Sequence, residues 1–287
     1  MAGFLSGLSK FGLGNMQDQK LYDDPKKKEG NGGQAAAPAK PLPKNEADFL
    51  FDKKYTCPIC ERSFISKTVR TGKVKMKAVD LDLRPDYDEV DQIKYDVVAC
   101  PECGYAALAR YFDGLIKYQK DEIRAKIAVN YMKQEPYGET YSYEVAKGRY
   151  ELALANAMVK KAKNSEKAFL CLKTAWLIRG WYEHMDPSTD DFKKRKDELL
   201  SEEKDLLKSA KEGFIMARQS EGFPIAGMDE GTLDYLIAAL AYETDDFDVA
   251  AKMAATIVSS RTASSRLKDK ARDLKDMISE RTKSAEE

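Results

Sequence analysis

Four of the chain's five cysteines form two matched pairs, and this spacing constrains the fold more than any other feature. The first pair is Cys57-Pro-Ile-Cys60 and the second is Cys100-Pro-Glu-Cys103, with residues 61–99 between them. A Cys-x-x-Cys turn presents two sulfurs to one metal ion, and a second such turn completes a tetrahedral shell. The sequence therefore predicts that Cys57, Cys60, Cys100 and Cys103 hold one metal ion in a small β-rich module.

Zinc is the metal that this ligand set favours, because zinc binds readily in tetrahedral thiolate cages. Four cysteines leave no position for water, so we expect a structural ion rather than a catalytic one. Iron also accepts four thiolates and stays open as a less favoured alternative. A redox dithiol of the thioredoxin type is a weaker interpretation, since it uses one pair beside a β-α-β unit. Gly104 follows the second pair and suits a turn with positive φ, whereas Glu61 follows the first.

Charge and hydropathy restrict the classes of partner and the cellular compartment that we expect for this protein. Lys plus Arg and Asp plus Glu both total 48, so the chain lacks the basic excess typical of proteins that bind nucleic acid or a membrane surface. No stretch approaches the roughly 20 apolar residues that span a bilayer, and the first residues lack the features of a secretory leader. We therefore expect a cytoplasmic protein whose thiols stay reduced, which favours metal binding over disulfides.

Composition and periodicity divide the chain into five parts. Residues 1–22 form an N-terminal tail, and residues 23–46, rich in Lys, Gly, Ala and Pro, are expected to be a disordered linker. Residues 47–112 form the cysteine module, and residues 113–138 a connecting helix. Residues 139–287 show only helical periodicity.

The N-terminal tail carries apolar residues at the spacing of a short helix. These residues are Phe4, Leu5, Leu8, Phe11 and Leu13. Four glycines in the same stretch weaken such a helix. Two interpretations stay open: a frayed end, or a docking peptide that folds on a partner.

Alternating residues predict strands in the cysteine module. Lysines alternate with apolar residues over 73–78, and the phase then flips, so we expect a bulge or break near residues 78–79. Pro85 should end the pairing, because proline cannot donate to a strand ladder. A second strand should cover residues 95–99, and the pattern after Gly104 predicts a helix.

The rest of the chain has the 3.6-residue period of helices, interrupted by short polar or Gly/Pro breaks. Helices are expected at about residues 140–162, 165–184, 188–220, 229–243, 246–260 and 262–283. Short connections between them imply that neighbouring helices run antiparallel.

Several of these features together resemble a known family. The CPIC knuckle, the Asp-rich stretch over 80–91, the run from Tyr95 to Ala106 and the helical remainder resemble a family of uncharacterised bacterial proteins, known as a domain of unknown function. The resemblance covers most of the chain from about residue 48. It implies the four-cysteine architecture and a bacterial cytosolic setting, but no activity. The two knuckles are also similar to those of a zinc ribbon.

The helical part resembles tetratricopeptide (TPR) repeats. Residues 245–250 look like the opening of the second helix of such a repeat, and residues 164–168 look like a poorer copy. Most of the repeat's Trp, Gly and Pro landmarks are absent, so the resemblance implies stacked helix pairs rather than a regular array. The predicted fold class is α+β, mainly α: a small zinc-ribbon-like β module followed by an antiparallel TPR-like helical domain.

The sequence offers no familiar catalytic set. His184 is the only histidine, and Cys171 lies among apolar residues of a predicted helix, so we expect a helix-end histidine and a buried core cysteine rather than a nucleophile and its base. The acids over 80–91 lack the spacing of a calcium-binding loop and are interpreted as a solvated loop. Gly-rich phosphate loops are missing as well.

A run of bases precedes the acidic stretch. Its candidate phosphate contacts are Arg70, Lys73, Lys75 and Lys77. Acidic and basic residues balance over 47–112, so two oppositely charged, partly pairing faces are favoured over a nucleic-acid site.

These observations predict a non-enzymatic zinc protein of the bacterial cytosol, with one zinc ion per chain. Its helical surfaces would bind an unknown protein or peptide. The alternative is a zinc-ribbon protein that binds nucleic acid, and no association with a membrane is expected.

Overall fold

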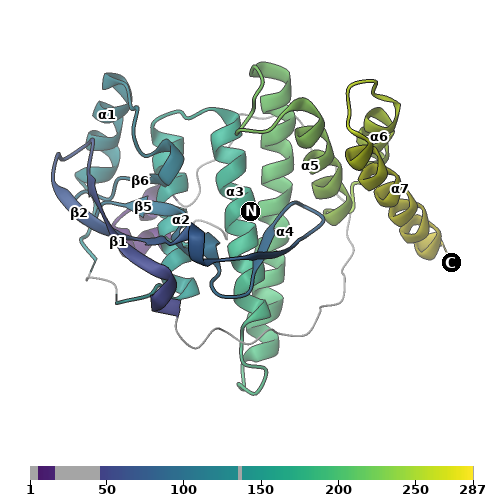
Figure 1. Cartoon of the computed structure of the whole chain (residues 1–287). Coiled ribbons are helices and arrows are strands. Elements are labelled where there is room, and N and C mark those ends of the chain that lie inside the picture. Colours follow the sequence, from purple (N-terminus) through teal and green to yellow (C-terminus); the bar gives the residue numbers. More distant parts are fainter. Residues whose placement is uncertain (1–5, 17–45, 135–137, 287) are drawn as a thin grey trace.

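The structure, a computed structural model, describes residues 6–16, 46–134 and 138–286. The strand pairs over residues 50–69 and 97–108 lie at one end of the molecule, and the long helices extend away from them to the C-terminal helix (Figure 1). The strand pair over residues 76–87 lies apart from these two, against the helices. The predicted class, α+β and mainly α, is confirmed. Within the part of the chain that the structure describes, no helix combines the length and apolar character needed to cross a bilayer.

The strands form three separate antiparallel pairs rather than one continuous sheet. The pairs are β1 (Leu50–Thr56) with β2 (Ser63–Val69), β3 (Met76–Val79) with β4 (Pro85–Tyr87), and β5 (Val97–Ala99) with β6 (Ala106–Leu108). Short 3-10 helices accompany them: η3 (Glu46–Phe49), η4 (Thr71–Lys73), η5 (Gln92–Tyr95) and η6 (Ala109–Tyr111).

The predicted irregularity in the basic strand exists, one or two residues earlier than expected, because the register of β3 shifts between Met76 and Ala78. The expectation for Pro85 is wrong. Pro85 opens β4 and pairs with Val79, at a first-residue position where a strand tolerates proline.

The helix predicted directly after Gly104 is also wrong. Ala106 to Leu108 form strand β6, paired with β5, and all three residues are buried. A short apolar run does not distinguish a buried strand from a buried helix, because neither shows an exposed face. The connecting helix begins only at α1 (Lys117–Ile123) and continues as the π-helical turn η7 (Arg124–Ala128).

The helices predicted after residue 139 are all present, with somewhat different ends. They are α2 (Tyr143–Val159), α3 (Asn164–Glu183), α4 (Phe192–Ser220), α5 (Glu230–Glu243), α6 (Phe247–Ser259) and α7 (Ser265–Glu286). Side chains of Ser142, Asp229 and Asp246 cap three of them. Consecutive helices pack on each other, but α3 and α4 have 20 and 29 residues and α5 and α6 have 14 and 13, so the TPR-like character stays a prediction.

Helix α2 is the central element of the core. It packs against β5 and β6 on one side and against α3 on another. Polar side chains of α2 bind η5 and β5: Tyr150 Oη donates to Ile93 O of η5 at 2.9 Å, and Arg149 donates to Val97 O of β5 at 2.7 Å. The cysteines and the residues of α2, α3 and α4 consequently belong to one continuous apolar core.

The acidic stretch over 80–91 is not a solvated loop, so that expectation is wrong. Asp82 is fully buried and accepts a hydrogen bond from Trp176 Nε1 at 2.8 Å. The turn between β3 and β4 lies on α3, and a buried carboxylate there needs a charged partner. Arg179 of α3 supplies it, with 3.1 Å between the guanidinium and Asp82 Oδ2.

Arg179 also binds carboxylates of two further helices. It contacts Glu203 of α4 at 2.6 Å and Glu243 of α5 at 3.4 Å. We call Arg179, Asp80, Asp82, Glu203 and Glu243 the Arg179 cluster. Because it joins the β3–β4 turn to three helices, this cluster fixes the hairpin on the helical part of the molecule.

The Arg179 cluster predicts how stability depends on pH. Burial, followed by the negative charge of Asp82, raises the pKa of Glu243 to about 8. The folded state therefore holds the Glu243 proton more tightly than the unfolded state, where the pKa is about 4.3. This stabilisation is complete below the unfolded pKa and is lost as pH rises toward 8. Glu243→Gln should flatten the fall in the free energy of unfolding between about pH 5 and pH 8.

Urea denaturation at several pH values would measure this slope. Glu198→Gln is the matched control, because Glu198 lies half exposed on α4 and forms a surface ion pair with Arg195 at 3.4 Å. Equal slopes for the wild type and Glu243→Gln would contradict the prediction.

Candidate metal centre

Each cysteine pair forms the turn of a β-hairpin. The first pair lies between β1 and β2, and the second between β5 and β6. The two turns share one hydrogen-bond pattern. Glu61 N donates to Cys57 O at 2.9 Å in the first, and Gly104 N donates to Cys100 O at 3.1 Å in the second. The hairpins therefore present both pairs in the same local geometry.

The residue after each pair adopts positive φ, at +62° for Glu61 and +71° for Gly104. Glycine reaches this region without strain, whereas Glu61 pays a conformational cost there. Glu61 is exposed, so its side chain gains nothing from burial in return. Because the first turn has Glu61 where the second has Gly104, the backbone of the first turn is strained at this residue.

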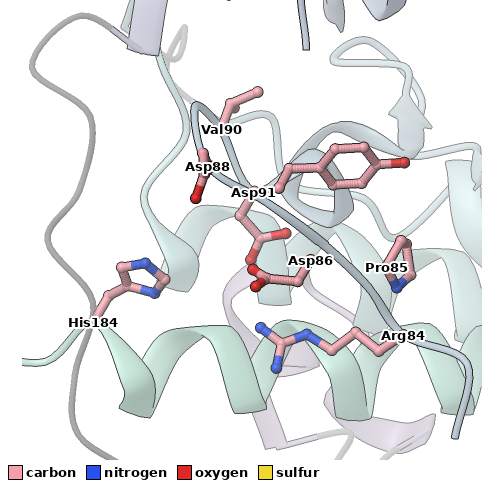
Figure 2. Close-up of a pocket in the computed structure, with 8 residues that line it drawn as sticks. Arg84, Pro85, Asp86, Asp88, Val90, Asp91 and His184 are labelled. Atoms are coloured by element: carbon pink, nitrogen blue, oxygen red, sulfur yellow. The ribbon is translucent and has the colours of Figure 1, made fainter. Parts of the chain in front are cut away.

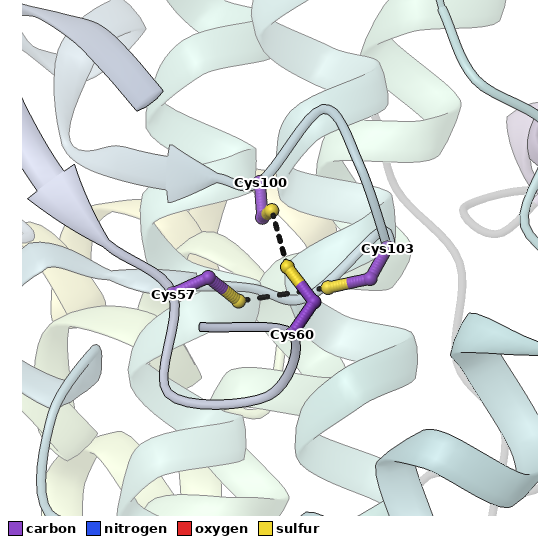
Figure 3. A group of neighbouring side chains, drawn as sticks. All are labelled: Cys57, Cys60, Cys100 and Cys103. Carbon is purple, nitrogen blue, oxygen red and sulfur yellow. Dashed lines mark hydrogen bonds between the residues drawn. The ribbon is translucent and has the colours of Figure 1, made fainter. Parts of the chain in front are cut away.

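The four sulfurs converge on one point (Figure 3). Cys57 Sγ lies 3.5 Å from Cys103 Sγ, and Cys60 Sγ lies 3.6 Å from Cys100 Sγ. All four sulfurs lie within 4.8 Å of one another. A tetrahedral zinc site with bonds of ~2.3 Å has sulfur–sulfur edges of about 3.8 Å, so the sulfurs fit such an ion with little movement.

The site is closed to solvent on most sides. Cys57 and Cys100 are fully buried and Cys103 is 5% exposed, while Cys60 is half-buried. Within residues 6–16, 46–134 and 138–286, this is the one group of three or more metal-binding side chains close enough to share an ion. A fully protein-ligated, buried shell is typical of a structural metal site.

The thiols favour one negative charge even before metal binds. Hydrogen bonds from Cys100 and then Cys103 lower the pKa of Cys57 to about 4. The pKa of Cys103 is raised, first by its hydrogen bond with Cys100, then by that with Cys57 and by burial. A cation would displace the remaining protons and stabilise the crowded sulfurs as thiolates.

Residues outside the shell hold the two turns in place. Arg124 of η7 donates to Ile59 O, inside the first turn, from Nε at 3.2 Å and Nη2 at 3.0 Å. Glu102, inside the second turn, forms ion pairs with Arg62 and Lys133. Arg124 was missed at the sequence level, because nothing in a helical run marks one arginine as a partner of a distant carbonyl.

The fold and this site define a mainly helical protein built on a four-cysteine centre. A family model described as "Uncharacterized protein conserved in bacteria (DUF2225)" matches residues 50–278, so the chain belongs to that family. The resemblance seen in the sequence is therefore confirmed. Comparisons with curated proteins and with solved structures find no match.

The structure does not assemble the candidate nucleic-acid residues into an unpaired basic face. Arg70 donates to Leu50 O at 2.9 Å and covers the ring of Phe51. Lys77 pairs with Asp88 at 2.9 Å. Lys73, at the end of η4, and Lys75, directly before β3, are exposed.

The remaining chemical candidates are held in structural roles. Cys171 is fully buried, and His184 caps the C-terminus of α3 with Nδ1 2.7 Å from Gly180 O, as expected. His184 borders a small pocket with Arg84, Asp86 and Asp91 (Figure 2). The pocket has a volume of about 20 Å³, which is room for about one water molecule.

Metal analysis tests the four-thiol site directly. Elemental mass spectrometry of the purified wild type should find one zinc per chain. Cys100→Ser removes one ligand and should lose both the metal and several kcal/mol of stability, because the metal is part of the folding free energy. Cys171→Ser, at a cysteine outside the site, is the control and should keep the zinc. Iron in the wild type, or full zinc in Cys100→Ser, would overturn this assignment.

The two positive-φ positions should respond oppositely to substitution. Glu61→Gly should raise the free energy of unfolding by about 0.5–1 kcal/mol, because it relieves left-handed strain at an exposed residue. Gly104→Ala should lower it by more than about 1 kcal/mol, since alanine is strained at this φ. Thermal and urea denaturation of the zinc-loaded proteins would measure both. Destabilisation by Glu61→Gly would refute the argument.

Proposed function

We propose that this protein is a non-enzymatic interaction protein of the bacterial cytoplasm. A structural zinc ion, with iron as the less favoured alternative, fixes the cysteine module, and the surface built on it binds a protein or peptide. The observation that carries this proposal is the closed, buried set of four thiols, because such a shell leaves no position for a substrate.

The best candidate binding surface is a cleft beside the metal centre. The cleft has a volume of about 400 Å³ and lies between β2, the second cysteine turn and α2. Its apolar lining includes Ile65, Ala99 and Leu152, and its charged lining includes Lys67 and Lys133. This size falls in the range of ligand-binding pockets, which combine apolar walls with a few placed polar groups.

The rim of the cleft has the character of an interface. Ile65 is 64% exposed, although isoleucine is among the residues most often buried and Ile65 lies in a strand of the cysteine module. Lys67 and Lys133 at the rim are paired with Asp52 and Glu102, so the charges are mutually compensated. An apolar centre within a paired polar rim suits a peptide better than a phosphate backbone.

The nucleic-acid alternative has less support. It depends on Arg70, Lys73, Lys75 and Lys77, and the first and last of these already have partners within the chain. Phosphate binding would weaken steeply with added salt, so a salt titration separates the two functions.

Substitution at the cleft tests the interaction proposal. Zinc-loaded wild type, Ile65→Asp and Met76→Asp would be used as baits in bacterial lysate, with quantitative mass spectrometry. Met76 is the matched control, because it is 58% exposed on a strand outside the cleft. The same protein should be enriched by the wild type and Met76→Asp and reduced at least about tenfold by Ile65→Asp, the factor expected from one lost apolar anchor.

Two outcomes would count against the proposal. One is the absence of any reproducibly enriched protein. The other is enrichment of RNA or DNA that disappears in high salt and in the Lys73→Ala/Lys75→Ala double variant, which would favour the alternative.

A further inference from the structure

The N-terminal segment, residues 6–16, is folded into the core of its own chain. It forms the 3-10 turns η1 (Ser6–Phe11) and η2 (Gly14–Met16), and η1 packs on α2. Its apolar side chains are almost fully enclosed. Leu8, Phe11, Leu13 and Met16 are each between 0% and 2% exposed. The apolar side chains Leu8, Phe11 and Leu13, noted in the sequence, therefore pack inside their own chain. Binding of this segment to a partner stays a prediction.

Glycines make this contact close. Gly12 has φ +78°, and a Cβ there would lie 2.1 Å from Asn130 O. A Cβ on Gly7 would lie 1.8 Å from Glu151 Oε2, and a Cβ on Gly148 would lie 2.5 Å from Lys10 Nζ. At Gly12 the obstacle is a backbone oxygen and φ is positive, so a larger residue would force the segment away from residues 130–134. At Gly7 and Gly148 the obstacles are the ends of the flexible Glu151 and Lys10 side chains, which can move aside. Gly12, one of the glycines that weaken a helix, is thus required for docking.

The other wall of the groove is the chain that follows η7. Met132 N donates to Phe11 O at 3.0 Å, and Gln134 Nε2 donates to Lys10 O at 2.9 Å. The ring of Tyr131 stacks on Phe11 with the ring centroids 6.1 Å apart. Residues 130–134 and α2 therefore hold the segment between them.

The same wall rests on both cysteine turns. A Cβ on Gly104, directly after Cys103, would lie 2.3 Å from the Tyr131 ring, so this ring lies on the second turn. Arg124 binds Ile59 O in the first turn. The positions of Arg124 and Tyr131, and with them the wall that holds Phe11, depend on the two turns being held together.

Covalent geometry does not confine the segment. Residues 17–45 separate Met16 from Glu46, and 29 residues span up to roughly 100 Å when extended. Non-covalent contacts alone therefore keep residues 6–16 in the groove. Their apolar anchors recur at intervals of three, two and three residues, which is the pattern a competing peptide would have to supply.

We propose that this groove is a peptide-binding site, that residues 6–16 are its exchangeable internal ligand, and that the metal centre controls the exchange. With metal bound, both turns support Arg124 and Tyr131, and the segment stays in place. Metal loss loosens this wall, frees the segment and opens the groove to a peptide with the same apolar spacing and a glycine at the position of Gly12. The proposal rests on the metal centre. Tyr131 and Gln134 also line the cleft beside Ile65, but Phe11 and Arg124 do not, so variants at these two residues test the exchange separately from the cleft.

Peptide exchange tests the proposal in the full-length protein. A site-specific protease sequence replaces residues 30–36, and the zinc-loaded protein is cleaved there. Size-exclusion chromatography should show that the N-terminal fragment stays bound. A fluorescently labelled peptide of residues 1–16 should then replace it slowly, as followed by anisotropy. After zinc is removed with a chelator, exchange should be at least about tenfold faster, while hydrogen exchange in α5 is unchanged.

Variants that keep all four cysteines separate control by the centre from general unfolding. Arg124→Gln should retain one zinc and accelerate exchange about tenfold, the factor that one lost charge-assisted hydrogen bond supplies. Lys126→Gln is the matched control in the same turn, because Lys126 is exposed and pairs with Glu122 on the surface of the helix. Phe11→Ala should release the fragment, whereas Asn15→Ala, at an exposed position, should not.

Three results would overturn the proposal. The fragment and peptide could fail to exchange in any state, which would make the segment a permanent part of the core. Exchange could be equally fast with and without zinc. If chelation unfolds α5 as well, equal exchange in Arg124→Gln and Lys126→Gln would be decisive against control by the metal centre.

Discussion

The meeting of two pairs of thiols is the interaction on which the rest of this structure depends. Strands β5 and β6 have three residues each, and β1 and β2 have seven, so isolated hairpins of this size are at best marginally stable. Four sulfurs within 4.8 Å would also resist close approach as thiolates. A shared cation would remove that repulsion and close the long loop between the pairs, so that metal–sulfur bonds would stabilise a module that has no continuous sheet.

Helix α2 connects the strands that carry the second cysteine pair to the other helices. It is buried nearly all round, which is unusual for a helix in a protein of this size. One side meets the strand pairs that carry the cysteines, and another meets α3. Asn156 of α2 donates to Gly104 O at 2.9 Å, beside Cys103, the last cysteine of the candidate metal site. The cysteine module and helices α2 to α5 therefore share one core.

The features that could be predicted from the sequence are those with short-range causes. Paired cysteines define their own turns, and the long helices after residue 139 repeat over many periods, so both were found. The features that were missed depend on distant neighbours. Residues Ala106 to Leu108 form a strand because β5 pairs with them. Asp82 can be buried because Arg179, about a hundred residues further along the chain, forms an ion pair with it. The glycines of residues 6–16 suggested an unstable helix, whereas in the fold Gly12 allows the segment to pack closely against Asn130.

The Arg179 cluster has a consequence for how such sequences vary. One guanidinium serves carboxylates from the β3–β4 turn, α4 and α5, so replacing Arg179 alone leaves several buried charges without a partner. Concerted replacement by apolar residues of similar volume would cost little, because buried ion networks contribute little net stability over a packed core. Asp82, Glu203 and Glu243 should consequently change together with Arg179 across the family, and seldom one at a time.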